Sequence, residues 1–311
     1  MITRGEGPGV VLLSGLLGGL PRLAPTADAL VARGFRVVTI DPYRLSAQAQ
    51  DVSFHGMARE VERALERIGM TSAVVVAHAH ATGIALRLAA NAPHLVDELV
   101  LIEGGLLHTT RSAGVSRAMQ VASLIARLPG GQALIRASLA SGIRANSGDA
   151  RWLTEAAARE YTDGLLKELP AVARMADRLA NAHEPEPPEA LLPRLRARIL
   201  MLVGAAPHDF APNAKEIDPL SALPAARVRR IEGVGHFVHE EALQLVVREI
   251  EAARSRAQGS ANATPPTTTT GTGDCMLEPS PSCPLELSPQ HQAAPGRTTA
   301  LRGGGISQPA G

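Results

Sequence analysis

The chain has 311 residues, with 45% hydrophobic and 20% charged side chains, which is close to the composition of an ordinary globular protein. Lysine and arginine (31) nearly balance aspartate and glutamate (30), so the net charge of +1 provides no bulk attraction to nucleic acid or to an anionic membrane. One Trp, two Tyr and four Phe are too few for a base-stacking surface, and two Cys exclude a disulfide framework as the source of stability.

The first segments of the chain carry no targeting or membrane signal. Residues 1–6 lack the basic and then apolar pattern of a signal peptide. The longest apolar runs, such as residues 9–20, are too short and too rich in glycine to span a bilayer. We therefore expect a cytoplasmic protein whose partner is a small-molecule substrate, with no nucleic acid and no membrane as partners.

Strand and helix patterns alternate along most of the chain. Short β-branched or aliphatic segments predict strands at residues 10–13, 34–40, 73–77, 99–102, 199–203 and 227–231. Apolar residues at helical spacing predict helices at 26–33, 56–68, 82–92 and 242–254. The segment 73–77 is wholly apolar, which is typical of a parallel strand covered on both faces. The pattern predicts an α/β fold with a doubly wound, mostly parallel sheet.

One long insertion interrupts this alternation. Residues 106–186 carry helical patterns only, at 118–126, 131–140, 152–161 and 164–180. We interpret this segment as a helical cap insertion over the carboxyl ends of the strands, where ligands of such sheets bind. A stiff proline-rich linker at 183–188 then leads back to the core, which is predicted to comprise residues 1–105 and 187–257.

The end of the chain has a different composition. Residues 258–311 are rich in Pro, Thr, Ser and Gly and carry no helical or strand period. Such a segment cannot bury enough apolar surface to offset the entropy of ordering, so we expect a disordered tail. Both cysteines, Cys275 and Cys283, lie in it and are interpreted as unstructured thiols, because no second ligand pair accompanies them.

Three segments carry a family resemblance. The segment 74–81, which reads Val-Val-Val-Ala-His-Ala-His-Ala, leads into an Ala- and Leu-rich helix and then Pro93. This resembles the strand, nucleophile elbow and helix of the α/β-hydrolase superfamily, and Pro93 lies fourteen residues after Ala79, the family's usual spacing from nucleophile to proline. The segment 233–241 resembles the loop of the catalytic histidine, and 10–15 resembles the strand before the oxyanion loop. The resemblance covers the whole predicted core.

The resemblance fails at the position of the nucleophile. The elbow needs Ser, Cys or Asp at its apex, and the apex here is Ala79, which can form no acyl-enzyme. Alanine also replaces the flanking glycines, at Ala77 and Ala81, and Ser14 stands where the oxyanion loop usually has histidine. The family pattern would place the acid at Pro207.

A general base and two alternative acids remain. His236 is the candidate acid or base, because imidazole titrates near neutrality. Glu103, at the end of the fourth predicted strand, and Asp209, after the fifth, are alternative partners that would orient it, and we expect only one of them to do so. By resemblance, the backbone N–H groups of Leu16 and His80 would form the oxyanion hole.

The remaining polar residues near the elbow have several interpretations. The ring of His80 could replace the missing hydroxyl as base or nucleophile, although a side chain turned toward the helical insertion is the simpler interpretation. Ser14 could be a displaced nucleophile or a turn residue. His78, which we expect to have a packing role, could join His80 and His236 on a metal, but no ligand spacing supports this, so we predict no metal. Neither G-x-G-x-x-G nor a phosphate loop is present, so we predict no cofactor.

Three hypotheses for function follow. The first is an enzyme that acts on a small apolar carbonyl or ester compound without a covalent serine intermediate, as a lyase, cyclase, decarboxylase or non-covalent hydrolase in a catabolic or natural-product pathway. The second is a non-catalytic protein that binds a small ligand or a partner. The third is an ester hydrolase with a rearranged triad that uses Ser14 or His80. The sequence does not predict the oligomeric state.

Overall fold

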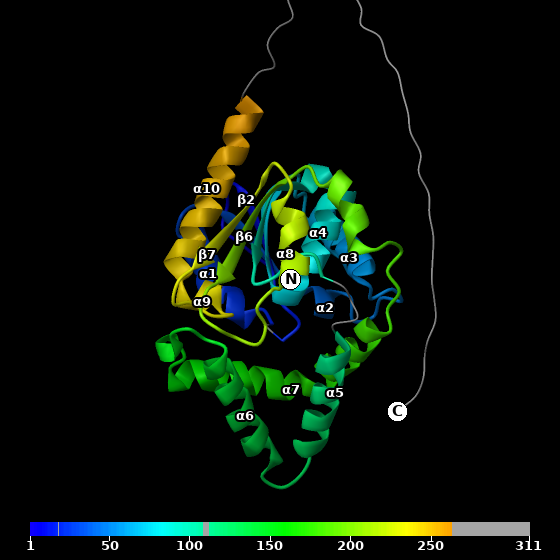
Figure 1. Cartoon of the computed structure of the whole chain (residues 1–311), viewed down its shortest axis with the longest axis vertical. Helices are drawn as coiled ribbons and strands as arrows, with labels where there is room; N and C mark the ends of the chain where they lie inside the picture. The colour runs from blue at the N-terminus through cyan, green and yellow to red at the C-terminus, as the bar shows by residue number, and fades with distance from the viewer. Residues whose placement is uncertain (18, 108–111, 263–311) are drawn as a thin grey trace, which may run out of the picture. The chain divides into compact units, whose positions relative to one another are not determined.

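The computed structural model describes residues 1–17, 19–107 and 112–262 (Figure 1). The two cysteines lie outside these residues, as does most of the predicted tail. The last helix, α10 (Leu243–Asn262), runs five residues beyond Ala257, at which we expected the folded region to end.

A single sheet forms the centre of the fold. Within the described residues it has seven strands in the order β1-β3-β2-β4-β5-β6-β7. They are β1 (Ile2–Arg4), β2 (Gly9–Leu13), β3 (Arg36–Ile40), β4 (Ala73–His78), β5 (Val96–Ile102), β6 (Arg198–Gly204) and β7 (Ala226–Ile231). Only β1 is antiparallel to its neighbour, and all other pairs are parallel. The predicted fold class is confirmed. Strand β1 was not predicted, because three half-exposed residues carry no period.

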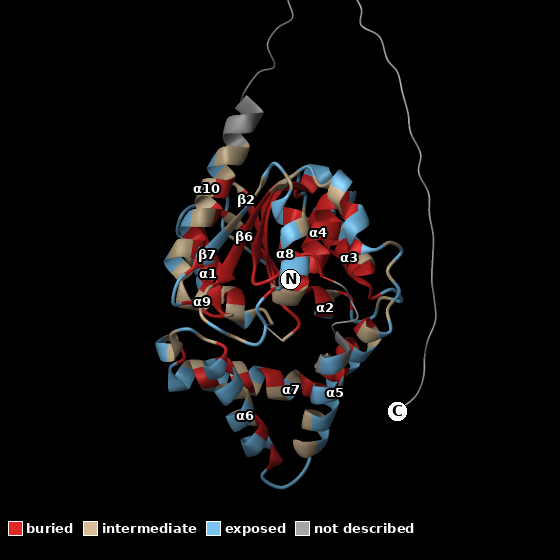
Figure 2. Ribbon diagram, in the orientation of Figure 1, coloured by how far each residue is buried: buried red, intermediate tan, exposed pale blue. Residues whose placement is uncertain are grey.

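Helices cover both faces of the sheet, so the strands have a core on each side (Figure 2). Alternate residues of β4 supply the two cores: Val75 packs with the helices α3 (Phe54–Arg67) and α4 (Thr82–Asn91), and Val74 with α1 (Ala24–Val31) and α10. Both faces of such a strand are buried, which explains its unbroken apolar sequence. Three short helices were not predicted or were predicted only as loops: α2 (Pro42–Leu45), α8 (Ala214–Ser221) and α9 (Val238–Glu241).

The insertion between β5 and β6 is helical. Its helices are α5 (Ser112–Ile125), α6 (Gly131–Ala145) and α7 (Glu155–Ala180), drawn in green below the sheet in Figure 1. We predicted two helices where α7 is one, and Pro170 lies inside it. The buried residues Leu165, Leu169, Ala173 and Ala176 on one side of α7 explain why the helix continues, because their packing outweighs the hydrogen bond that proline removes. None of the described helices combines the length and the hydropathy that crossing a membrane requires.

A buried ion pair fastens the returning chain to the core. The carboxylate of Glu184 lies 2.9 Å from the guanidinium of Arg87 on α4, whose side chain is 1% exposed. The same carboxylate accepts a hydrogen bond from the N–H of Phe54, at 2.7 Å, at the start of α3. The end of the insertion is therefore fixed against two core helices.

Candidate active site

A strained turn joins β4 to α4. The strand ends at His78, residues Ala79–Ala81 form one 3₁₀ turn, and α4 begins at Thr82. Ala79 has φ of +50°, in the left-handed region that side chains other than glycine rarely adopt. A buried strand, a tight turn and a helix thus follow one another here, and the side chain at the left-handed residue of the turn is a methyl group. Glu103, directly after the neighbouring strand β5, also has a positive φ of +53°.

Two glycine-containing loops press against this turn. A Cβ at Gly15 would lie 3.1 Å from the carbonyl oxygen of His78 and 3.6 Å from the Cβ of Ala79. A Cβ at Gly104 would lie 2.7 Å from the carbonyl oxygen of Ala79. The loop after β5 can approach the turn this closely only because residue 104 is glycine, and a side chain at Gly15 would be a tight fit in the loop after β2.

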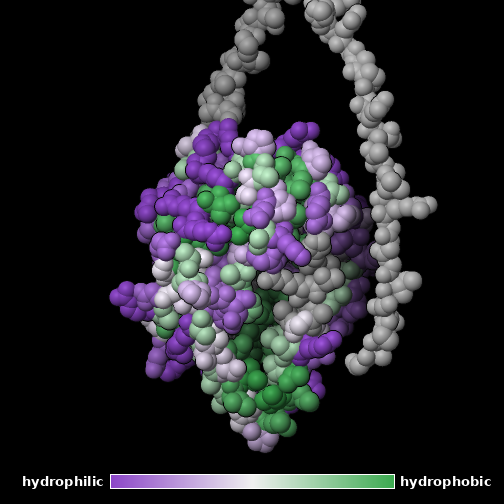
Figure 3. All heavy atoms as spheres, in the orientation of Figure 1, coloured by the Kyte–Doolittle hydropathy of each residue, from purple (hydrophilic) through white to green (hydrophobic). Residues whose placement is uncertain are grey.

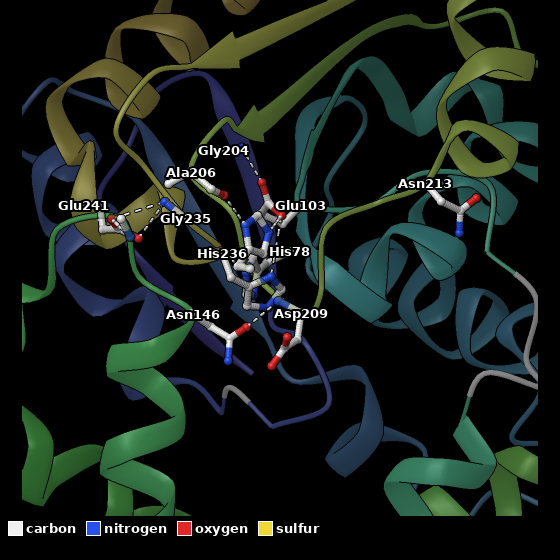
Figure 4. Close-up of polar contacts among 12 residues, drawn as sticks. His78, Glu103, Asn146, Gly204, Ala206, Asp209, Asn213, Gly235, His236 and Glu241 are labelled. Atoms are coloured by element: carbon white, nitrogen blue, oxygen red, sulfur yellow. Dashed lines mark hydrogen bonds and ion pairs between the residues drawn. The ribbon is translucent and has the colours of Figure 1, made fainter.

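His236 and Glu103 lie side by side. The Nδ1 of His236 is buried and lies 3.6 Å from Oε2 of Glu103, which is longer than a hydrogen bond (Figure 4). The other Glu103 oxygen, Oε1, accepts a hydrogen bond from the N–H of Gly204. The side chain of Glu103 is fully buried and that of His236 is 12% exposed. Of the two alternative acids, Glu103 is therefore the one that the fold brings to His236.

Asp209 has a different environment. It lines the cavity, and its backbone N–H donates to Oδ1 of Asn146 at 2.8 Å. Its carboxylate points away from Glu103 in Figure 4 and contacts no cationic or histidine side chain among the described residues. Asn146, at the end of α6, also accepts the N–H of His236 at its carbonyl, at 2.8 Å. One insertion residue thus holds both the Asp209 loop and the His236 loop.

His208 is a site residue that the sequence analysis missed. Its side chain is fully buried, Nε2 lies 2.7 Å from Oε2 of Glu103, and Nδ1 lies 2.8 Å from the carbonyl oxygen of Ala206. Both ring nitrogens of His208 therefore lie next to hydrogen-bond acceptors. Oε2 of Glu103 is close to two histidines, His208 and His236. The signal was available, because His208 is adjacent to Pro207, where the family pattern places the acid.

The structure also places the histidines of the elbow. His78 is buried, and its Nε2 donates to the carbonyl of His236 at 3.2 Å. Burial, with His239 and His236 nearby, holds the pKa of His78 well below its usual value, so the ring is neutral. His80 lines the cavity but its Nδ1 lies 3.1 Å from the hydroxyl of Tyr43, and its ring packs edge-on against Phe54. The ring thus packs against the core helices α2 and α3, whereas the sequence analysis had turned it toward the helical insertion.

Ser14 is not at the mouth of the crevice, where we had considered it as a nucleophile. It is 1% exposed at the end of β2, and its N–H donates to the carbonyl of Ile40 at 3.1 Å. Its side chain is not among those of the described residues that line the cavity. Leu16, two residues later, does line the cavity.

The metal ligands that the fold could offer share only His236 with the set considered from the sequence. One ligand atom each from Glu103, His208 and His236 lie within 4.8 Å of one another. Glu103 and His208 are enclosed, however, and both oxygens of the one and both nitrogens of the other already contact polar groups. We interpret the cluster as a hydrogen-bonded network. His80 does not join it, because its ring contacts Tyr43.

A cavity of about 460 Å³ lies between this network and the insertion. Its apolar lining comes from both sides, including Leu16, Leu107, Met119, Leu139, Ile143 and Leu165. Figure 3 shows a hollow with hydrophobic residues inside it, above the insertion helices. The volume suits a small to medium ligand.

One arginine is among the described residues that line the cavity. The guanidinium carbon of Arg22 lies 4.1 Å from the centre of the Tyr161 ring, and both residues line the cavity. The Tyr161 hydroxyl donates to Glu240. Burial lowers the pKa of Arg22 to about 10, and the attraction of Glu240 opposes this effect. Burial raises the pKa of Glu240 to about 7, with Arg22 opposing and Glu160 adding to the shift. The sequence analysis missed this group.

Comparison with known proteins identifies the family. The model of the alpha/beta hydrolase fold family matches residues 8–243. The sn-1-specific diacylglycerol lipase ABHD11 of Mus musculus is 25% identical over 75% of this chain and 76% of its own length. The magnesium-chelatase 30 kDa subunit of Rhodobacter capsulatus is 29% identical over 76% and 83%. The structure of a malate-bound esterase from Thermogutta terrifontis has a TM-score of 0.63 at 17% identity, covering 82% of this chain and 92% of the esterase. The chain is therefore a member of the alpha/beta hydrolase fold family.

Proposed function

We propose that the protein is an α/β-hydrolase-fold enzyme that acts on a small, largely apolar carbonyl or ester compound without a covalent serine intermediate. The observation that carries this proposal is the elbow: its strained backbone is intact at Ala79, beside His236 and the cavity, although its side chain cannot attack. The lipase named above acts on an ester of a lipid, which supports an apolar ester as one substrate class.

The reaction would use His236 as the base. With Nδ1 facing Glu103, Nε2 is the nitrogen left to meet a ligand in the cavity. It would remove a proton either from a water that attacks the substrate carbonyl or from the carbon next to that carbonyl. Glu103 would orient the ring and stabilise the imidazolium that forms.

The negative charge that develops on the substrate oxygen needs hydrogen-bond donors. The loops after β2 and β4 meet at the elbow, and the N–H groups of Leu16 and His80 are the proposed donors. Among the described residues, no acceptor is bonded to the N–H of Leu16, which is a buried residue. The insertion would keep bulk water from the substrate, which strengthens these contacts.

The alternative function is ligand binding without chemistry, and the methyl group of Ala79 is the observation that favours it. Mass spectrometry of the protein during turnover of a p-nitrophenyl ester panel separates the two. We expect slow hydrolysis by the wild type without an acyl adduct, loss of that hydrolysis in His236→Gln, and an acyl adduct in Ala79→Ser.

Three results would change the interpretation. An acyl adduct on the wild-type protein would assign the chemistry to a rearranged triad. Wild-type hydrolysis that survives in His236→Gln would remove the proposed base. A folded wild type and a folded Ala79→Ser that are both inert toward every ester, while they still bind one, would support the non-catalytic alternative.

A further inference from the structure

Among the described residues that line the cavity, Arg22 is the one arginine, in a lining that also contains Glu103, Asp209 and Glu216, and none of these carboxylates forms an ion pair with it. No carboxylate among the described residues lies within ion-pair distance of its guanidinium, whose carbon lies over the Tyr161 ring, 4.1 Å from the ring centre. Arg22 is only partly exposed, and a cation held largely away from water without a counter-ion is costly, so such a residue requires an explanation.

Three other arginines, of which Arg87 is buried and Arg254 and Arg256 are partly exposed, have carboxylate partners. Arg87 lies 2.9 Å from Glu184, Arg256 pairs with Glu98 at 2.5 Å, and Arg254 pairs with Asp97. The fold thus supplies a carboxylate where an arginine is buried for structural reasons. At Arg22 it supplies an aromatic face and an opening into the cavity.

Glu240 is the carboxylate whose charge raises the pKa of Arg22, and it already has a hydrogen-bond partner. Its carboxylate accepts the Tyr161 hydroxyl, and it lies beyond ion-pair distance of Arg22. The neighbouring rings of His78 and His239 provide no negative charge, and burial keeps both of them neutral. The guanidinium therefore remains the unmatched charge of this side of the cavity.

We propose that Arg22 binds a carboxylate of the substrate, so that the ligand is an apolar carbonyl or ester compound with one anionic end; this inference rests on the function proposed above. The planar guanidinium presents paired N–H donors that match a carboxylate, and the Tyr161 ring behind it holds the plane in place. Because Arg22 follows the loop that carries Leu16, the anionic end and the reacting carbonyl would lie against the same loop.

Calorimetric titration with two probes tests the proposal. Monohexyl succinate carries a carboxylate, and hexyl methyl succinate is its neutral counterpart of similar size. We expect the wild type to bind the anionic probe about tenfold more tightly or better, as a charge-assisted pair implies. Arg22→Met should remove this preference while leaving the affinity for the neutral probe within about twofold, and Arg22→Lys should retain part of it. Arg63→Met, a change at an exposed residue on α3, is the matched control and should change neither affinity.

Thermal unfolding without any ligand gives an independent readout. If Arg22 is unmatched in the free protein, Arg22→Met should leave the melting temperature unchanged or raise it. A lowered melting temperature together with a retained preference for the anionic probe would make Arg22 a structural residue and overturn the proposal. Equal affinity of the wild type for both probes would also overturn it but would leave the proposed function intact. A wild type that binds neither probe would overturn both.

Discussion

The strained backbone at Ala79 predicts an unusual gain of stability. In Ala79→Gly the only group removed is a methyl that lines the cavity, so no enclosed void forms. A residue with a Cβ in the left-handed region costs about 1–2 kcal/mol, and glycine does not have this cost. Glycine in turn loses about 0.5–1 kcal/mol more backbone entropy on folding. The net expectation is a free energy of unfolding higher by about 0.5–1 kcal/mol.

Urea unfolding followed by circular dichroism measures this difference, and the midpoint should rise with an unchanged slope. In thermal unfolding the same change corresponds to about 1–4 °C for a domain of this size. The matched control is Ala81→Gly, two residues later. Ala81 is fully buried and has φ of −72°, so glycine there has no strain to relieve and should destabilise the protein by about 1 kcal/mol or more.

The opposite signs of the two glycine variants are the critical result. If Ala79→Gly destabilises the protein as much as Ala81→Gly does, the turn at Ala79 is not left-handed. The elbow geometry on which the proposed function depends would then be refuted together with the stability argument.

Three further predictions concern buried charges and protons. Glu184→Ala should lower the free energy of unfolding, measured in urea, by about 3–5 kcal/mol, because Arg87 would be buried without a counter-ion. The double variant Arg87→Met/Glu184→Leu should recover most of this loss. A loss below about 1 kcal/mol in the single variant would contradict the role of the pair. Burial lowers the pKa of His239 from 6.5 to about 3, so between these pH values the unfolded chain binds this proton and the folded chain does not. The stability of the wild type should therefore fall as the pH drops from about 6.5 toward 3. His239→Gln should make the melting temperature less dependent on pH over that range, and an unchanged slope would disprove the argument. Burial raises the pKa of Glu240 from 4.5 to about 7, so the contribution of Glu240 to stability is complete below about pH 4.5 and is lost as the pH rises through 7. Melting curves of Glu240→Gln should lack this loss. A variant whose melting temperature depends on pH as strongly as that of the wild type between about pH 4.5 and 8 would count against this argument.

Most of the sheet could be predicted from local sequence. Unbroken apolar sequences predict the strands β2 and β4, and apolar residues at helical spacing predict the helices α3 and α4. The reason is that a buried face must be apolar wherever it lies in the fold. The elbow could also be located, since its strand, turn, helix and following proline are neighbours in the chain. The errors are local as well. Strand β1 is too short for a period, and α7 continues through Pro170 because tertiary packing outweighs propensity.

Pairings between distant residues could not be predicted in this way. The sequence left Glu103 and Asp209 as equal partners for His236, and the fold separates them, because Glu103 ends a strand beside the His236 loop while Asp209 faces Asn146. It gave no role to His208 or Arg22, which acquire theirs only through residues 105 and 139 positions away, Glu103 and Tyr161.

The sequence by itself thus determined the family, the layered fold and the position of the turn at Ala79, since each of these depends on residues close together in the chain. The tertiary structure decided which acid faces His236, that Ser14 is enclosed, and that one arginine lies in the apolar cavity. The physical reason is that charge, burial and hydrogen bonding act over a few ångströms of space, whatever the separation along the chain.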